Sequence, residues 1–224
     1  MASLHNPKIQ LVLFDFDGTL VDTAPDLIRA ANLYLKSQNI QPISEGRIRR
    51  EIGMGLRRLI VEIYPCENKD LEFRQRIERE FIEVYEREYL TTPRLFPGVY
   101  EFLHEFEGRV AIVSNKRERF IKAILKQLKL DTFPWVRVVG GDTYEHMKPH
   151  PLPFFKVMEA AGVSPEETLI VGDGAPDVEG AMAVGCQSVV VEFGYTPFEE
   201  LMDIGGTYSI GSYEELLPLV QSIT

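Results

Sequence analysis

The sequence predicts an α/β fold, a doubly wound parallel sheet with an inserted all-helical subdomain. Three observations lead to this prediction. Short apolar runs recur, segments of helical periodicity separate them, and the stretch between residues 22 and 92 has no strand pattern. With 224 residues, 45% of them hydrophobic, the chain is long enough to bury a sizeable core and a smaller companion.

The first predicted strand, residues 9–14, reads IQLVLF and is followed by the helical stretch. Three amphipathic faces lie in that stretch: Leu27, Ile28, Ala31, Tyr34 and Leu35; Leu56, Leu59, Ile60 and Ile63; Phe73, Ile77, Phe81 and Tyr85. The third helix also alternates charges around Glu78–Glu80 and Glu86–Glu88, which predicts a solvated face with spaced ion pairs. The prolines of residues 91–98, TTPRLFPG, end that helix and predict the return hinge.

Strand and helix alternate from about residue 95 onward. Four further strands are predicted at residues 109–114, 135–140, 168–173 and 187–193. Ser164 with Glu167, and Ser212 with Glu215, have the spacing of helix capping boxes. We therefore expect two domains, a core made of residues 1–21 and 93–224 and a helical subdomain made of residues 22–92.

The composition narrows the class of partner. The chain has 34 acidic and 24 basic residues and a formal net charge of −10, which disfavours a nucleic-acid or anionic membrane partner. Its two cysteines, Cys66 and Cys186, form no CxxC motif or Cys/His cluster, so we expect reduced thiols in a cytoplasmic protein. The N-terminal apolar run stops at Phe14, too early for a signal sequence or a membrane span.

Polar residues follow the predicted strands, at the edge of a parallel sheet where ligands bind. They are Asp15, Asp17, Gly18 and Thr19 after the first strand; Ser114, Asn115 and Lys116 after the second; and Asp173, then Asp177, after the fourth. Lys148 lies in the segment MKPHP, shortly before the helix that leads to the fourth strand. We expect these residues to converge on one edge.

Such a cluster of acids requires a compensating charge. Crowded carboxylates repel one another unless a cation or a proton intervenes, and oxygen ligands favour Mg²⁺ with a substrate phosphate as a further ligand. Lys148 and the amides after Asp15 would neutralise the phosphate, and Ser114 and Asn115 would donate hydrogen bonds to it. Asp15 fits the role of nucleophile, and Asp17 fits that of proton donor and acceptor.

Four motifs in order resemble the haloacid dehalogenase superfamily, in its phosphatase branch with a helical cap after the first strand. They are DFDGT at 15–19, VSN at 113–115, KPHP at 148–151 and GDGAPD at 172–177, and the resemblance covers essentially the whole chain. It implies that residues 22–92 are the cap.

The resemblance also implies roles for individual residues. Asp15 would form an aspartyl-phosphate and Asp17 would act as acid and base. Phosphate binding falls to Gly18, Thr19, Ser114, Asn115 and Lys148, while Mg²⁺ would be held by Asp15, the backbone carbonyl of Asp17 and Asp173, with Asp177 orienting the metal shell. The family often has Ser or Thr where this chain has Gly174, which leaves the hydrogen bonding around Asp173 open.

The cap segment GMGLRRLI, residues 53–60, is open to two interpretations. Arg57 or Arg58 could reach a carboxylate or a second phosphate of the substrate. Alternatively, this is the start of a helix with two solvated arginines.

The expected function is a Mg²⁺-dependent phosphomonoesterase that acts on a small phosphorylated metabolite. SNK at 114–116 and the cap pattern G-x-G-L-R-x-L look most like phosphoglycolate phosphatases, which makes 2-phosphoglycolate the first candidate substrate. Other phosphatases of the superfamily, acting on pyrophosphate, sugar phosphates or nucleotides, remain alternatives, as does a β-phosphoglucomutase-like phosphomutase. A dehalogenase or a receiver-like signalling module fits less well, because Asp17 supplies an acid and base that neither requires.

Overall fold

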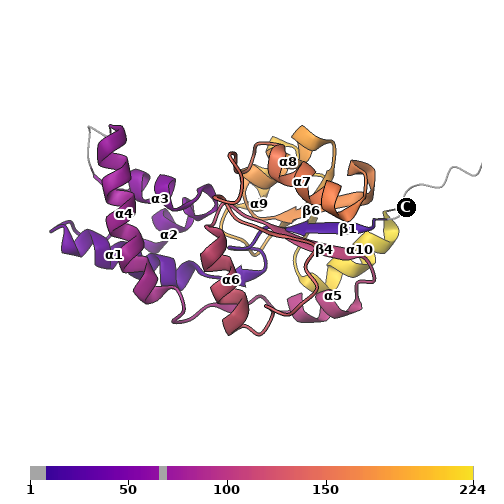
Figure 1. Ribbon diagram of the computed structural model, residues 1–224, viewed down its shortest axis with the longest axis horizontal. Coiled ribbons are helices and arrows are strands. Elements are labelled where there is room, and N and C mark those ends of the chain that lie inside the picture. The colour runs from indigo at the N-terminus through magenta and orange to yellow at the C-terminus, as the bar shows by residue number, and fades with distance from the viewer. Residues whose placement is uncertain (1–8, 66–69, 224) are drawn as a thin grey trace, which may run out of the picture.

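A six-stranded parallel sheet forms the centre of the molecule in the computed structural model, which describes residues 9–65 and 70–223 (Figure 1). Its strand order is β5-β4-β1-β6-β7-β8. The strands are β1 (Leu11–Phe14), β4 (Arg109–Val113), β5 (Val138–Val139), β6 (Thr168–Gly172), β7 (Gln187–Val191) and β8 (Tyr208–Ile210). The predicted fold class is confirmed.

Helices cover both faces of this sheet. They are α5 (Val99–Glu105), α6 (Glu118–Gln127), α7 (Leu152–Ala161), α8 (Ala175–Val184), α9 (Phe198–Ile204) and α10 (Leu216–Ser222), with 3-10 turns η2 (Pro165–Glu167) and η3 (Tyr213–Glu215). Alternate side chains of β1 lie on opposite faces of the sheet. Val12 and Phe14 pack with α5, α6 and α10, whereas Leu11 and Leu13 pack with α7 and α8. Burial on both faces explains why β1 is an unbroken apolar run.

The remaining helices gather at one end of the molecule (Figure 1). They are α1 (Ala24–Ser37), α2 (Glu45–Arg49), α3 (Leu56–Ile63) and α4 (Leu71–Glu88), with the 3-10 turn η1 (Ile52–Met54). The predicted apolar faces of α1, α3 and α4 form one buried cluster, from which only Phe73 stands half-exposed. Phe120 of α6 joins the cluster and so connects these helices to the sheet region.

A short antiparallel pair lies where the chain enters and leaves the helical segment. Strand β2 (Val21–Asp22) pairs with β3 (Arg94–Leu95), and the Arg94 guanidinium lies 3.1 Å from the Asp22 carboxylate. The sequence did not predict this pair, because two-residue strands are too short to have a pattern. It places Asp22, the first residue of the expected helical range, in a strand.

Three other local predictions were wrong. The strand expected at 135–140 is only Val138–Val139, and Trp135 lies in the loop before it, where its indole N–H donates to the Leu130 carbonyl. Ser164 with Glu167 forms its capping box, whereas the Ser212 side chain makes no cap hydrogen bond. Glu78 is not solvated but only 7% exposed, because two arginines neutralise it.

In the described ranges, no helix is both long and apolar enough to cross a membrane. Cys186 is half-buried beside the Met158 sulfur, at 3.9 Å, and burial raises the pKa of its thiol to about 12. Cys66 lies outside the described residues.

Candidate active site

The carboxyl ends of β1, β4 and β6 bring together the polar residues that the sequence singles out. Asp15 and Asp17 follow β1, Ser114 and Asn115 follow β4, Asp173 follows β6, Asp177 lies in the first turn of α8, and Lys148 lies in the loop before α7. All are buried, with exposed fractions between 2% and 7%. Burying so many ionisable groups is costly unless they are paired, so the contacts among them decide what the site can do.

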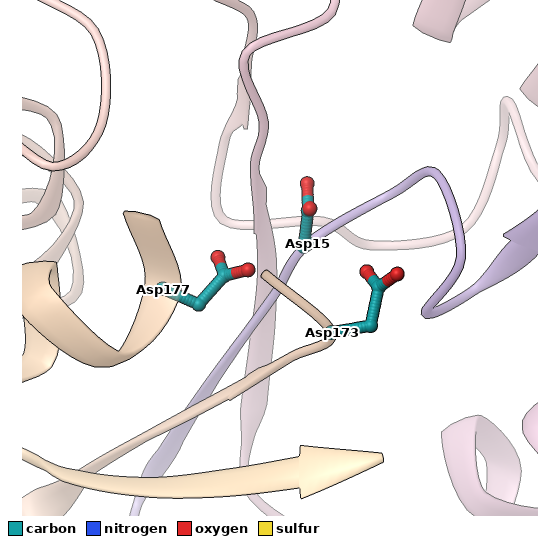
Figure 2. Close-up of side chains that lie close together, drawn as sticks. All are labelled: Asp15, Asp173 and Asp177. Atoms are coloured by element: carbon teal, nitrogen blue, oxygen red, sulfur yellow. The ribbon is translucent and has the colours of Figure 1, made fainter. Parts of the chain in front are cut away.

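Three carboxylates point into one common space (Figure 2). One oxygen each of Asp15, Asp173 and Asp177 lies within 4.8 Å of the others. Burial, and then the charge of Asp15, raise the pKa of Asp173 well above its ordinary value. Burial also raises the pKa of Asp177, to about 7, against the lowering effect of Lys148. Three oxygen donors that repel one another fit a hard divalent cation.

Gly18 makes room for this cluster. Its φ is +80°, and a Cβ at this position would lie 2.1 Å from Asp173 Oδ2. Any other residue would therefore push Asp173 away and strain the backbone. The glycine of the DFDGT motif thus sets the distance between the loop after β1 and the Asp173 carboxylate.

Lys148 lies between two of the three acids. Its Nζ is 2.9 Å from Asp15 Oδ1 and 2.6 Å from Asp177 Oδ1. Burial lowers the pKa of Lys148, but the charges of Asp15 and Asp177 more than offset this, so that the pKa is raised. Asp15 also accepts a hydrogen bond from the Phe16 amide at 2.6 Å. The site therefore holds a permanent positive charge beside the nucleophile candidate.

Other groups hold Asp173 in place, because Gly174 offers no hydroxyl. Its Oδ1 accepts a hydrogen bond from Thr19 Oγ1 at 3.0 Å, and its Oδ2 accepts one from the Tyr195 amide at 2.8 Å. The Thr19 hydroxyl is thus committed to a carboxylate. Tyr195 is a site residue that sequence reasoning missed, because its contribution is a backbone N–H and carries no residue signal.

Asp17 has partners that sequence reasoning also missed. Lys116 Nζ lies 2.9 Å from Asp17 Oδ1, and Thr23 Oγ1 donates to the same oxygen at 2.5 Å. Lys116 directly follows Ser114 and Asn115, so its place at the strand end was visible in the sequence. Its pairing with Asp17 was not, because the two are joined only by the register of β1 and β4.

Ser114 and Asn115 use their side chains differently. Ser114 Oγ accepts the Lys116 amide at 3.3 Å, which leaves its own O–H able to donate to a ligand. The Asn115 amide group donates to the carbonyls of Gly53 and Lys148, at 3.3 and 3.2 Å. The Asn115 donors expected to bind phosphate are therefore in use, whereas the Ser114 hydroxyl is not. The Asn115 Oδ1 atom is buried and has no hydrogen-bond partner within the described ranges.

A cavity of about 750 Å³ adjoins the site, between α3, α4 and the loop after β4. Asn115 and Lys148 line it on the sheet side, and Arg57 and Arg58 line it on the helical side. Arg57 is paired with Glu78 at 2.5 Å. Arg58 is exposed and makes no ion pair with any residue that the structure describes. Arg57 and Arg58 lie in the first turn of α3 and also line the cavity beside the site, and their contact with a substrate stays a prediction.

Comparison with known proteins agrees with this geometry. A family model described as haloacid dehalogenase-like hydrolase matches residues 12–191. A phosphoglycolate phosphatase of Chromobacterium violaceum is 32% identical over 221 residues, 96% of this chain and 97% of the relative. A phosphoglycolate phosphatase of Xylella fastidiosa is 38% identical over 192 residues, 84% of this chain and 82% of the relative.

Solved structures share the fold along nearly the whole chain. A protein from Haemophilus somnus, described as a predicted phosphoglycolate phosphatase, superposes with a TM-score of 0.85 and 28% identity over 96% of this chain and 99% of its own. A haloacid dehalogenase-like family hydrolase from Streptococcus pneumoniae has a TM-score of 0.84 with 21% identity over 96% and 99%, a likeness of fold alone.

Proposed function

The chain belongs to the haloacid dehalogenase-like hydrolase family, and on this premise we propose that it is a Mg²⁺-dependent phosphomonoesterase acting on a small phosphorylated metabolite, with 2-phosphoglycolate as the first candidate. The single observation that carries the proposal is the buried group of Asp15, Asp173 and Asp177 with Lys148 between two of them. This arrangement offers oxygen ligands for a cation and a fixed positive charge for a phosphate. We also propose that the protein acts in the cytoplasm.

The residues fit a divalent cation. Asp15, Asp173 and the backbone carbonyl of Asp17 would hold Mg²⁺, and Asp177 would orient its shell. When bound, the cation would neutralise the crowded acids and polarise the phosphoryl group of the substrate. Thr19 and the Tyr195 amide would keep Asp173 in place for this role.

The reaction follows from the positions of the two acids after β1. A carboxylate oxygen of Asp15 forms a bond to phosphorus as the ester P–O bond breaks, and the proton of Asp17 passes to the departing alcohol oxygen. Water then attacks the phosphorus and gives its proton to Asp17, while the bond between Asp15 and phosphorus breaks. Lys148 and the Ser114 hydroxyl bind phosphate oxygens throughout. Phosphate and alcohol leave, and both acids return to their first state.

The helical segment would select the substrate. We propose that residues 22–92 act as a cap on a core made of residues 1–21 and 93–224, with hinges near residues 21–23 and 91–97. The β2–β3 pair lies at these crossings, and the cavity lies between the two parts. The part of the substrate beyond its phosphate would occupy the cavity, with Arg57 or Arg58 facing it.

The test is a screen for phosphate release with Mg²⁺ across 2-phosphoglycolate, pyrophosphate, sugar phosphates and nucleotides, compared by kcat/KM. We expect release from at least one ester, the highest kcat/KM with 2-phosphoglycolate, and loss of release on chelation. Isomerisation of a sugar phosphate without release of phosphate would instead identify a phosphomutase. A well-folded protein that is inert toward the whole panel would contradict the proposal.

A further inference from the structure

Lys116 joins the helical segment to the edge of the sheet. Its Nζ lies 2.9 Å from Asp17 Oδ1, 3.2 Å from Asp17 Oδ2 and 2.8 Å from Tyr85 Oη. Asp17 follows β1, Lys116 follows β4, and Tyr85 lies on α4. Three segments that are distant in the sequence therefore meet at one ammonium group.

This meeting point is fully buried. Lys116 is 3% exposed, Tyr85 0% and Asp17 6%. An ammonium group carries three N–H donors, and the three contacts use all of them. Hydrogen bonds between a buried ammonium and a carboxylate are short and strong, so Lys116 has one position, set by Asp17 on one side and Tyr85 on the other.

Asp17 is restrained as a result. Lys116 reaches both of its oxygens, and Thr23, at the start of α1, donates to Oδ1 as well. A proton donor must lie within hydrogen-bond distance of the atom it protonates, and small displacements are costly for the rate. The group with the strictest geometrical task is thus oriented by residues that are not aimed at the phosphate site.

We propose that Lys116 and Tyr85 are positioning residues for the proton transfer by Asp17, so that helix α4 acts on the chemical step through Lys116. The inference rests on the proposed function, in which Asp17 protonates the leaving oxygen. As the bond between Asp15 and phosphorus forms, the ester P–O bond breaks and the Asp17 proton moves to that oxygen. Lys116 and Tyr85 neither gain nor lose a proton in this step.

The test compares two esters that differ in their need for an acid. The p-nitrophenolate of p-nitrophenyl phosphate leaves without a proton, whereas the alkoxide of 2-phosphoglycolate requires one. The measured quantity is kcat/KM, which includes departure of the leaving group. With Lys116→Met we expect a loss of about 10²-fold on the alkyl ester and less than about 10-fold on the aryl ester. With Tyr85→Phe we expect a loss of about 10-fold on the alkyl ester alone.

Tyr89→Phe is the matched control. Tyr89 lies one turn beyond Tyr85, its ring centroid is 5.7 Å from that of Tyr85, and its hydroxyl has no hydrogen bond in the described part of the chain. We expect Tyr89→Phe to leave kcat/KM unchanged for both esters.

The double variant Lys116→Met/Tyr85→Phe should have the same kcat/KM as Lys116→Met alone, because Tyr85 acts through Lys116.

The outcomes separate this inference from the proposed function. If kcat/KM falls equally for the two esters, or does not fall with either variant, the positioning role is overturned while the phosphatase activity stands. A wild-type protein that releases phosphate from neither ester overturns the proposed function itself. If thermal unfolding reveals that Lys116→Met does not fold, Tyr85→Phe carries the test, since it removes one hydroxyl and keeps the ring.

Discussion

The edge of the sheet and the cavity wall of the helical segment differ in how tightly their charged groups are held. At the edge, Asp15, Asp173 and Lys148 are at most 3% exposed and each has short polar contacts to its neighbours. At the cavity wall, the Arg57 side chain is 58% exposed and Arg58 lies in solvent. Rigid groups suit a reaction that is the same for every phosphate ester, and exposed groups suit a choice among esters. Changes at Asp15, Asp173 or Lys148 should therefore lower kcat for all substrates, and changes at the wall should alter KM for some.

The largest effect is expected at the nucleophile candidate. Asp15→Asn keeps the shape of the side chain but replaces the attacking carboxylate by an amide, so kcat should fall at least about 10³-fold for every ester tested. Phosphate release under saturating substrate measures this. A variant with kcat within about 10-fold of the wild type would mean that another group attacks the phosphorus.

Gly18→Ala should disturb the cation site without removing a ligand. The added Cβ would lie 2.1 Å from Asp173 Oδ2, at a backbone φ of +80°. We expect the Mg²⁺ concentration for half-maximal activity to rise about 10- to 100-fold, because displaced neighbours weaken metal sites by this amount. A Mg²⁺ titration measures it.

Gly162→Ala is the matched control for Gly18→Ala. Gly162 has a similar φ of +68°, lies at the end of α7, and an added Cβ would have no atom of the described residues within 4 Å apart from its chain neighbours and its own helix. It should carry the backbone strain without the displacement of Asp173. Equal effects of the two substitutions on the Mg²⁺ titration would show that strain alone, and not crowding of Asp173, is responsible.

The sequence predicts the residues that meet at the edge of the sheet far better than the contacts at the cavity wall. Asp15 directly follows β1 and Asp173 directly follows β6, so sheet topology alone brings the two together. Contacts between segments leave no such pattern. Glu78 lies among alternating charges and looks solvated, yet it is buried because Arg57 and Arg117 reach it from α3 and from the loop after β4. The role of Lys116 was hidden for the same reason, since its partners depend on how α4 packs over the sheet.

Arg58→Met tests whether the wall selects substrates. Arg58 lines the cavity and pairs with no described residue, so its charge is open to an anionic group of the substrate. We expect KM for 2-phosphoglycolate to rise about 10-fold and kcat to stay unchanged, because a charged hydrogen bond contributes roughly 1.5–3 kcal/mol. For p-nitrophenyl phosphate, which has no carboxylate, both constants should stay unchanged.

Arg79→Met is the control for Arg58→Met. Arg79 is an exposed arginine of α4 that does not line the cavity. It should change neither KM nor kcat. A rise in KM that is the same for both esters with Arg58→Met would indicate a general loss of positive potential and would remove Arg58 from substrate selection.

The smallest effect is expected from Glu78→Gln, which changes the charge of the wall without exposing a new group to the substrate. Glu78 neutralises both Arg57 and Arg117, at 2.5 and 2.7 Å, and all three line the cavity. With a neutral Gln, the cavity gains positive potential, and KM for 2-phosphoglycolate should fall about 3-fold at low ionic strength with little change in kcat. Because salt screens the charge of the exposed Arg57, the difference should shrink when ionic strength is raised to about 0.5 M. Glu83→Gln, an exposed carboxylate on the same helix outside the cavity, should have no such effect. A rise in KM with Glu78→Gln that persists at high salt would instead mean that Glu78 acts by fixing the positions of the two arginines, and the wall would then resemble the edge in its rigidity.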